Sequence, residues 1–387
     1  SATYTFNFGQ RPFSYTVPTG FKTLKSRNLL LTVPSIVRPK RHFDTILYVG
    51  DTSGNLKVTG LEFKPDLVWI KYRQGSDNHQ LFDTMRGFNN GLRLFPNDNS
   101  GESANGSQYG MISVEDGGFT VGAGPFEANR DGGNHVAWCW KAGGAGVSNT
   151  EGDITSSVSV NEEAGFSIVT YTGNGSNGQT VGHGLSQAPQ WILLKARDAT
   201  QNWRVWHHKL AADGSKRLLL DSTNASEDAS FLNDTAPTST VFTLGNADDA
   251  WNANSAKFIA YCWHEVPGYS KFGTYTGNGS TDGTYVHLGF RPAFILLKSS
   301  DATRNWVLID NKRSAVSGAN PNDYTLEANN GNNEYTNGAV ASTDMISNGF
   351  KFRGSAADSN NSGTTYIYMA FAEQPGTTPF DTFPNAR

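Results

Sequence analysis

Cysteine is nearly absent from this chain of 387 residues, which contains only Cys139 and Cys262. The two occupy equivalent positions in two copies of a repeat that is described below. A bond between them would require the interiors of two separate domains to meet, which disulfide geometry forbids. We therefore expect both thiols to be buried and free, and we do not expect the fold to need an oxidising compartment.

Long apolar runs and clusters of basic residues are also lacking. No stretch of 18 apolar residues occurs, so the sequence contains no candidate membrane span. Lys and Arg number 31 against 35 Asp and Glu, a formal net charge of −4, and no run of five basic residues is present. Nucleic acid is therefore not an expected partner. Residues 1–6 already have the pattern of a strand rather than of a signal peptide, and since the chain lacks an initial Met we expect its natural start upstream.

Glycine and aromatic residues are abundant, with 42 glycines and 12% Phe, Trp and Tyr. Apolar or alternating stretches of strand length end at clusters of Gly, Asn, Asp or Ser. Examples are FSIVTYTG (166–173), WILLKAR (191–197) and FIAYCW (258–263). Helical spacing of apolar residues is hard to find. The composition and pattern together predict an all-β fold of sandwiches or barrels.

Two short sequence motifs, called phrases below, each occur three times along the chain. The first is PDLVWIK (65–71), PQWILLK (189–195) and PAFILLK (292–298), and the second is VAWCWK (136–141), IAYCWH (259–264) and IYMAFA (367–372). A period of about a hundred residues exceeds the roughly 20–50 residues of solenoid repeats. The repeat therefore indicates tandem domains.

The repeat predicts three tandem β-sandwich domains of jelly-roll-like type. Roughly a hundred residues suffice for one core between two sheets. The joints between repeats are short, so we expect the domains to pack in a fixed arrangement. The predicted division is 1–34 for an N-terminal segment, 35–42 for a linker, 43–144, 152–267 and 269–375 for the three repeats, and 376–387 for a C-terminal tail.

Residue types used in catalysis occur, but not in the patterns that catalysis requires. The eight histidines form no HExxH motif and no Cys/His metal set, and no GxSxG motif is present. A glycosidase needs two converging carboxylates. The aligned positions do not keep an acidic residue in all three copies, because Asp83 aligns with His207 and Asp310. We predict no enzyme activity, no cofactor and no bound metal. The Asn- and Asp-rich loop 97–105 has oxygen ligands of the kind that Ca²⁺ prefers, but we expect a solvated turn there.

Aromatic side chains beside polar groups are the remaining functional signal, because such rings stack on sugars. The segment 198–208 (DATQNWRVWHH) has this composition. Successive strand residues point to opposite faces, so Trp203 lies on one face while Arg204 and Trp206 share the other. Trp203 aligns with Trp306, which assigns it to the core. We therefore predict that Arg204 and Trp206 are exposed and contact a ligand.

Trp251 is a further candidate for ligand contact. It lies within the polar segment 248–255 (DDAWNANS). An exposed ring there would be a stacking platform, and the alternative is that it pins a loop.

Residues 6–21 (FNFGQRPFSYTVPTGF) resemble the closing strands of SPRY-type, concanavalin-like domains of bacteriophage virion proteins. A whole SPRY domain is far longer, so the resemblance implies that residues 1–34 are the end of one and that the chain is part of a longer polypeptide. The remainder resembles the repeat domains that follow such segments in tailed phages. The phrases that carry this resemblance are VAWCWKAGG (136–144), ITSSVSVNEEAGFSIVTYTGNG (154–175), VGHGL (181–185) and FAEQP (371–375).

This resemblance implies a structural protein of the virion, in a tail fibre, tail appendage or capsid decoration. The expected work is attachment to the host surface, with other virion proteins and host-surface polysaccharide as partners and a homo-oligomeric state. An alternative is a purely architectural capsid or tail component without a ligand. A third hypothesis is a polysaccharide-degrading tail enzyme, which predicts an acid pair across a groove lined by Trp.

Overall fold

The computed structural model describes residues 35–375 except 89–90, 105–109, 125–126, 246–249, 315–319 and 337–341. Nearly all of the regular structure in this part of the chain is antiparallel strand. The short helical elements include α1 (Ala357–Asn360) and the 3₁₀ turns Pro39–Arg41 and Ser230–Leu232. The predicted all-β sandwich fold is therefore confirmed. The SPRY-like segment 1–34 and the tail 376–387 lie outside the described residues.

The first unit, residues 43–140, consists of two sheets. The large sheet has the order β1-β7-β3-β4 and the small sheet β2-β6-β5. The first strand therefore pairs with the last, and the second with the next to last. The bounds are β1 Phe43–Val49, β2 Leu56–Thr59, β3 Leu67–Tyr72, β4 Gln80–Asp83, β5 Met111–Glu115, β6 Gly118–Val121 and β7 Asn134–Trp140.

The second unit, residues 147–263, repeats this plan with additions at both edges of its large sheet. That sheet has the order β15-β14-β13-β12-β17-β10-β9-β8, and the small sheet is β11-β16. The bounds are β8 Val147–Asn149, β9 Ser156–Asn161, β10 Phe166–Thr172, β11 Thr180–Gly182, β12 Trp191–Ala196, β13 Arg204–His207, β14 Lys216–Leu219, β15 Glu227–Asp228, β16 Val241–Thr243 and β17 Lys257–Trp263.

The third unit, residues 270–372, has the large sheet β18-β26-β20-β21-β22-β23 and the small sheet β19-β25-β24. Its strands are β18 Ser270–Thr276, β19 Tyr285–His287, β20 Pro292–Ser299, β21 Val307–Asp310, β22 Tyr324–Glu327, β23 Tyr335–Thr336, β24 Thr343–Ile346, β25 Gly349–Phe352 and β26 Thr365–Ala372. The register is the same in all three units. The repeated phrases meet as Leu67 opposite Asp83, Trp191 opposite His207 and Phe294 opposite Asp310.

Each unit has its own apolar core between its two sheets. Cys139 lies in the core of the first unit and Cys262 in that of the second, and both are buried and free. The expectation for the two thiols is therefore confirmed.

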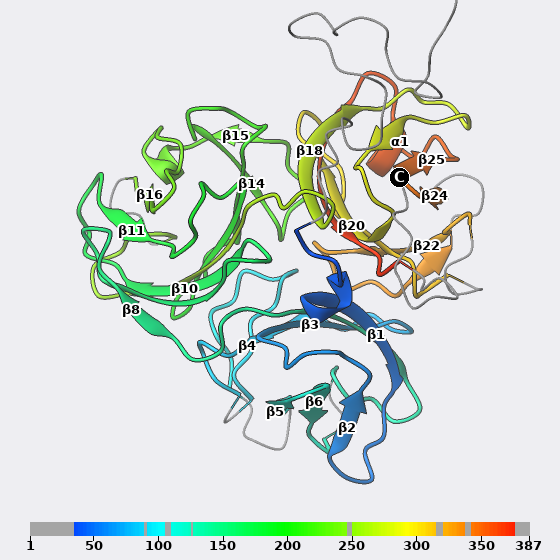
Figure 1. Ribbon diagram of the computed structural model, residues 1–387, viewed down its shortest axis with the longest axis horizontal. Helices are drawn as coiled ribbons and strands as arrows, with labels where there is room; N and C mark the ends of the chain where they lie inside the picture. The colour runs from blue at the N-terminus through cyan, green and yellow to red at the C-terminus, as the bar shows by residue number, and fades with distance from the viewer. Residues whose placement is uncertain are drawn as a thin grey trace, which may run out of the picture.

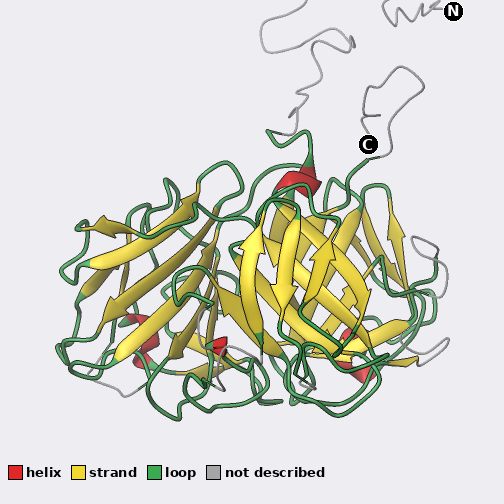
Figure 2. Ribbon diagram, turned by 90° about the horizontal axis from the view of Figure 1, so that it is seen from below, coloured by secondary structure: helices red, strands yellow, loops and turns green. Residues whose placement is uncertain are grey.

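The other faces of the three large sheets pack against one another around a common centre, and Figure 1 shows the resulting three lobes. The strands traverse this body while loops gather at its two ends (Figure 2). The rings at the centre include Trp69, Trp138, Trp140, Trp191, Trp203, Trp263, Phe294, Trp306 and Phe371. The void left among them has a volume of about 10 Å³, which is about the least that one water molecule needs.

Aromatic contacts join each unit to its neighbours at this centre. The ring centroids of Trp140 and Trp263 lie 6.3 Å apart, those of Trp191 and Trp306 6.0 Å, and those of Trp140 and Phe294 5.7 Å. Such edge-to-face pairs contribute about 0.5–1.5 kcal/mol each beyond the area that they bury. The central strands are therefore buried on both faces, which explains their continuous apolar runs.

Candidate binding groove between the second and third units

The three residues predicted to bind ligand are buried. Arg204 is 7% exposed, and Trp206 and Trp251 are each 3% exposed. The prediction that Arg204 and Trp206 are exposed is wrong, and so is the hypothesis that Trp251 is an exposed platform. Residues 204 and 206 do lie on the opposite face of β13 from Trp203, but that face belongs to the second unit's own core, while Trp203 lies in the central core.

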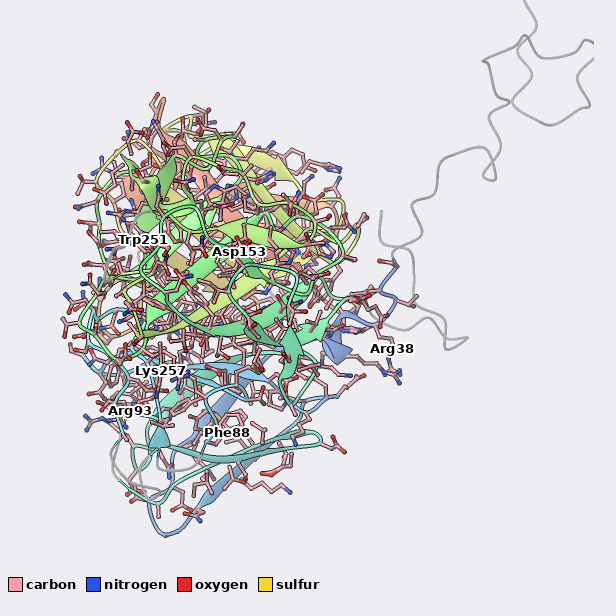
Figure 3. The ribbon with its side chains drawn as sticks, turned by 90° about the vertical axis from the view of Figure 1, so that its left-hand side faces the viewer. Arg38, Phe88, Arg93, Asp153, Trp251 and Lys257 are labelled. Atoms are coloured by element: carbon pink, nitrogen blue, oxygen red, sulfur yellow. The ribbon has the colours of Figure 1, made fainter. Side chains whose placement is uncertain are left out.

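Trp251 belongs to a structural anchor that occurs in each unit. Its carbonyl accepts the hydroxyl of Tyr171 at 2.6 Å, as the carbonyl of Ala128 accepts Tyr48 and that of Ser359 accepts Tyr275. Its ring packs on Phe231 with centroids 5.6 Å apart, within the second unit (Figure 3). The alternative that Trp251 pins a loop therefore describes its contacts.

Comparison of the units also explains three buried lysines with altered pKa values. Burial lowers the pKa of Lys71, Lys195 and Lys298 to about 8 in each case. Each ammonium donates to the carbonyl of the next residue and to that of the fourth residue along. Because all three units share this arrangement, we assign the lysines to the fold rather than to chemistry.

Asp221 carries the second altered pKa that invites a catalytic interpretation. Burial raises the pKa of this carboxyl to about 6. Its Oδ1 accepts the backbone N–H of Trp203 at 3.2 Å, and Asn329 accepts the N–H of Trp306 in the same way at 2.7 Å. Asp221 therefore takes the place of a structural amide at the start of β13.

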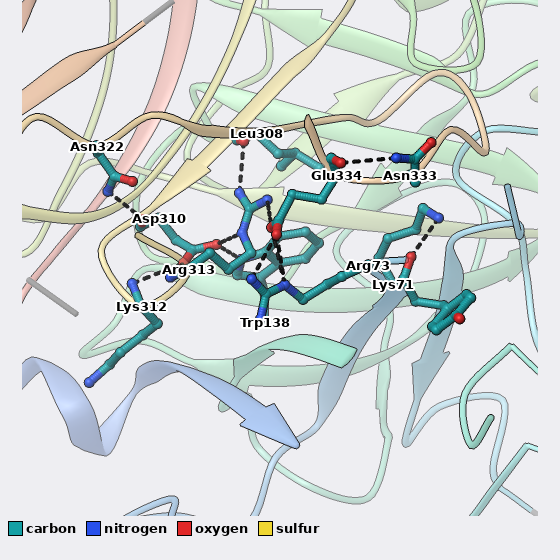
Figure 4. Close-up of polar contacts among 11 residues, drawn as sticks. Lys71, Arg73, Trp138, Leu308, Asp310, Lys312, Arg313, Asn322, Asn333 and Glu334 are labelled. Carbon is teal, nitrogen blue, oxygen red and sulfur yellow. Dashed lines mark hydrogen bonds and ion pairs between the residues drawn. The ribbon is translucent and has the colours of Figure 1, made fainter. Parts of the chain in front are cut away.

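A buried ion-pair network joins the third unit to the first (Figure 4). Arg313 donates from Nε to Asp310 at 2.5 Å and forms an ion pair with Glu334 at 3.0 Å. Trp138 of the first unit donates its indole N–H to Asp310 at 3.0 Å, and Arg73 pairs with Glu334 at 2.7 Å. Burial alone would lower the pKa of Arg313, but Asp310 and Glu334 raise it above its usual value.

The first and second units meet through a second network with the equivalent arrangement. Arg86 donates to Asp83 at 2.5 Å and pairs with Glu102 at 3.3 Å. The Tyr261 hydroxyl of the second unit donates to Asp83 at 2.7 Å, and Arg197 pairs with Glu102 at 2.9 Å. Tyr261 therefore stands where Trp138 stands at the other junction.

The junction of the second and third units is neutral at all of these positions. The residues equivalent to Asp310, Arg313, Glu334, Arg73 and Trp138 are, in that order, His207, Leu210, Ser226, Ser300 and Met369. Burial lowers the pKa of His207 well below its usual value, so its ring is neutral at pH 7. The backbone contact is kept, because Ser226 donates its N–H to the carbonyl of Ser300 at 2.8 Å.

A groove of about 550 Å³ opens at this junction, within the size range of ligand pockets. It lies between the outer edge of β18, the strand β19 and the end of the second unit's large sheet. The lining residues are Gln190, His208, Lys209, Glu265, Lys271, Phe272, Gly273, Thr274, Tyr275, Tyr285, Val286, His287 and Tyr368. Of the Phe, Trp and Tyr side chains that the structure describes, only Tyr285, at 43%, is exposed, and the others are buried or half-buried.

The groove is open because nothing in the described chain pairs with the outer edge of β18. At the equivalent place in the second unit, β9 pairs with β10. Residues 141–165 precede β10 and supply that strand, whereas only residues 264–269 separate β17 from β18. His208 instead donates its Nε2–H to the carbonyl of Phe272 at 3.0 Å.

At one pair of facing strand positions along the groove, the small and the large side chain have changed places relative to the other units. Gly273 of β18 lies opposite Tyr368 of β26. The equivalent pairs are Ile46 with Ala137 and Val169 with Ala260. A Cβ atom added at Gly273 would lie 2.4 Å from the Tyr368 hydroxyl oxygen. Glycine is therefore what allows the tyrosine hydroxyl to lie over β18, at the groove.

The aromatic pair on β19 is likewise confined to the third unit. Tyr285 and His287 flank buried Val286, and the tyrosine hydroxyl lies 3.0 Å from His287 Nδ1. The matching residues are Lys57 and Thr59 in the first unit and Thr180 and Gly182 in the second. The sequence analysis missed this site because it considered only tryptophans as stacking rings. An alignment of the three repeats that recorded departures would have indicated Tyr285.

Metal-ligand clusters and membrane-spanning helices are both lacking in the described ranges. No three or more His, Cys, Asp or Glu side chains among those residues come together as metal ligands. None of the helices there has the length and apolar character of a membrane span.

Comparison with known proteins gives the family of the chain. No curated protein and no solved structure matches it. Residues 38–375, which contain all three units, match the family model described as "Domain of unknown function (DUF7483)". The match spans most of the chain, and the protein therefore belongs to the DUF7483 family.

Proposed function

We propose that this protein is a structural component of a bacteriophage particle that is displayed on the virion and attaches it to the host surface. The observation that carries the adhesive part is the groove at the junction of the second and third units. It combines the exposed ring of Tyr285 with polar side chains from both units. A ring beside hydrogen-bonding groups is the composition of a carbohydrate site.

The rigid body supports the same proposal. Three units share one aromatic core and two buried ion-pair networks. The groove is formed by two units, so its geometry depends on their fixed packing. The phage setting rests on the resemblance of residues 6–21 and of the repeats to virion proteins.

Binding to bacteria tests the proposed function directly. The purified chain is mixed with a panel of bacterial strains, and the fraction that sediments with the cells is measured against protein concentration. We expect saturable sedimentation with some strains, which their soluble surface polysaccharide abolishes. Absence of cell binding across the panel would contradict attachment.

A purely architectural role is the alternative, and one observation favours it. Leu47 and Val49 on β1, the outer strand of the first unit's large sheet, are 40% and 57% exposed. The equivalent residues are Thr170 and Thr172 in the second unit and Thr274 and Thr276 in the third. An exposed apolar sheet edge favours pairing with another chain, and we propose a second copy of this protein as that chain.

The double variant Leu47→Thr, Val49→Thr tests the architectural role. Its mass in solution is compared with that of the parent by sedimentation equilibrium. If β1 is a self-association surface, the parent forms oligomers and the variant dissociates with its fold intact. Equal masses would remove the observation in favour of this alternative.

The polysaccharide-cleaving hypothesis requires two facing carboxylates. The described lining of the groove contains one carboxylate, Glu265. Asp83 and Asp310, the aspartates at the aligned strand ends, are each bound by an arginine in the buried networks. The geometry of the groove therefore adds no support to that hypothesis.

A further inference from the structure

We infer that the groove between the second and third units binds a carbohydrate that bears carboxylate groups, with one sugar ring stacked on Tyr285. This inference rests on the proposed attachment function and assigns its site and ligand class. It uses the side chains that distinguish this junction from the other two.

Tyr285 is a fixed platform. It is paired with Lys351 across β19 and β25, and its neighbour Val286 is buried in the third unit's core. The contact of its hydroxyl with His287 restrains the ring further. A ring that is already held in place loses little conformational freedom when a ligand stacks on it.

The floor of the groove offers hydrogen-bonding groups that a sugar can use. The Tyr368 hydroxyl is protonated at neutral pH, as an ordinary tyrosine is, and burial and then the nearness of Glu265 raise its pKa further. Thr274 is exposed on β18, and Gln190 lies across the groove on the second unit. These groups, together with the Glu265 carboxylate, provide both donors and acceptors for hydroxyls.

The charged groups of the groove favour an acidic ligand. The groove is lined by two lysines, Lys209 and Lys271, and by one glutamate, Glu265, in a protein whose formal net charge is −4. Lys271 is oriented by donating to the carbonyl of His287 at 3.0 Å, which leaves further ammonium hydrogens to donate. A carboxylate on the sugar would balance this excess, and charge-assisted hydrogen bonds to it are stronger than neutral ones.

A matched pair of polymers tests the ligand class. An acidic bacterial polysaccharide rich in uronic acid and the same polymer with its carboxyls reduced to alcohols are titrated into the full chain by calorimetry. We expect the acidic form to bind at least tenfold more tightly at low salt, and the difference to shrink as salt screens the charges. Equal affinity for the two forms would overturn the acidic assignment.

A matched pair of variants tests the site. Tyr285→Ala is expected to weaken binding at least fivefold, whereas Lys57→Ala, at the equivalent position of the first unit, is expected to leave it unchanged. Lys271→Gln is expected to remove most of the preference for the acidic polymer. Near-ultraviolet circular dichroism confirms that each variant is folded.

The outcomes separate the inference from the proposed function. If the parent binds cells and Tyr285→Ala binds the polymer equally well, the site lies elsewhere and only the inference fails. If the parent binds neither cells nor any polymer, both fail. If Tyr285→Ala and Lys57→Ala weaken binding equally, the groove is not the site.

Discussion

Two kinds of junction hold the three units together, and the difference between them locates the candidate site. The junctions of the first unit with the second and with the third each bury an Asp–Arg pair, with Tyr261 or Trp138 donating to the carboxylate. At the junction of the second with the third unit the pair is replaced by His207 and Leu210. Buried ion pairs are therefore not required for this packing, in keeping with the finding that apolar replacements are often neutral.

An open groove lies at the neutral junction, and several side chains that line it differ from the equivalent residues of the other units. Tyr285, His287 and the Gly273–Tyr368 pair all belong to it. Where the three copies agree, the shared residue is explained by the fold, as with the three buried lysines. Departures from the repeat therefore distinguish residues available for binding from residues committed to structure.

The largest expected effect comes from breaking one ion pair at the junction of the third and first units. Arg313→Leu leaves the carboxylate of Asp310 buried without its main partner, which costs about 3–5 kcal/mol of unfolding free energy. Asp310→His combined with Arg313→Leu copies the neutral junction and is expected to cost less than the single change. Urea unfolding of the three proteins measures this, and a double variant less stable than Arg313→Leu would refute the equivalence of the junctions.

The size exchange along the groove gives the next largest effect. Gly273→Val places a side chain against the Tyr368 hydroxyl, and overpacking of this kind costs about 1–3 kcal/mol. Adding Tyr368→Ala recreates the Val169–Ala260 pair of the second unit, so the double variant is expected to recover stability. Thermal unfolding of both variants measures the coupling, and simple additivity of the two changes would contradict the exchange.

Acid is expected to act on the neutral junction through His207. Its pKa in the folded protein lies well below the usual 6.5. As the pH falls below 6.5 the unfolded chain therefore binds the proton first, and the free energy of unfolding falls by about 1.4 kcal/mol per pH unit for such a group. His207→Asn removes this contribution, so its stability is expected to fall less steeply between pH 6.5 and 5.

Urea unfolding at several pH values measures the two slopes. Comparison with the parent separates the contribution of His207 from groups whose effect on stability runs in the opposite direction. Asp221 is such a group, because its pKa is raised to about 6 and its protonation stabilises the folded state as the pH falls. Parallel slopes for parent and variant would show that His207 does not control the acid response of this junction.

The repeat made much of each unit predictable. Apolar strand phrases and turn residues indicated the central strands, and the alignment of Asp83, His207 and Asp310 matches their shared register. The alternation of β13 correctly separated Trp203 from Arg204 and Trp206. The burial of Trp206 and Trp251 was not predictable, because alternation tells which residues share a face and not what covers that face.

The amino-acid sequence by itself determined the all-β class, the three copies with their alignment and the free thiols, since these follow from local alternation and from positions within one repeat. The tertiary structure decided which faces meet. Trp138 and Asp310, which lie 172 residues apart in the chain, become hydrogen-bonded only when the third sheet packs on the first. It also decided that Tyr285 is the exposed ring among the described Phe, Trp and Tyr residues, because exposure depends on the whole set of surrounding elements and not on the residue or its neighbours in sequence.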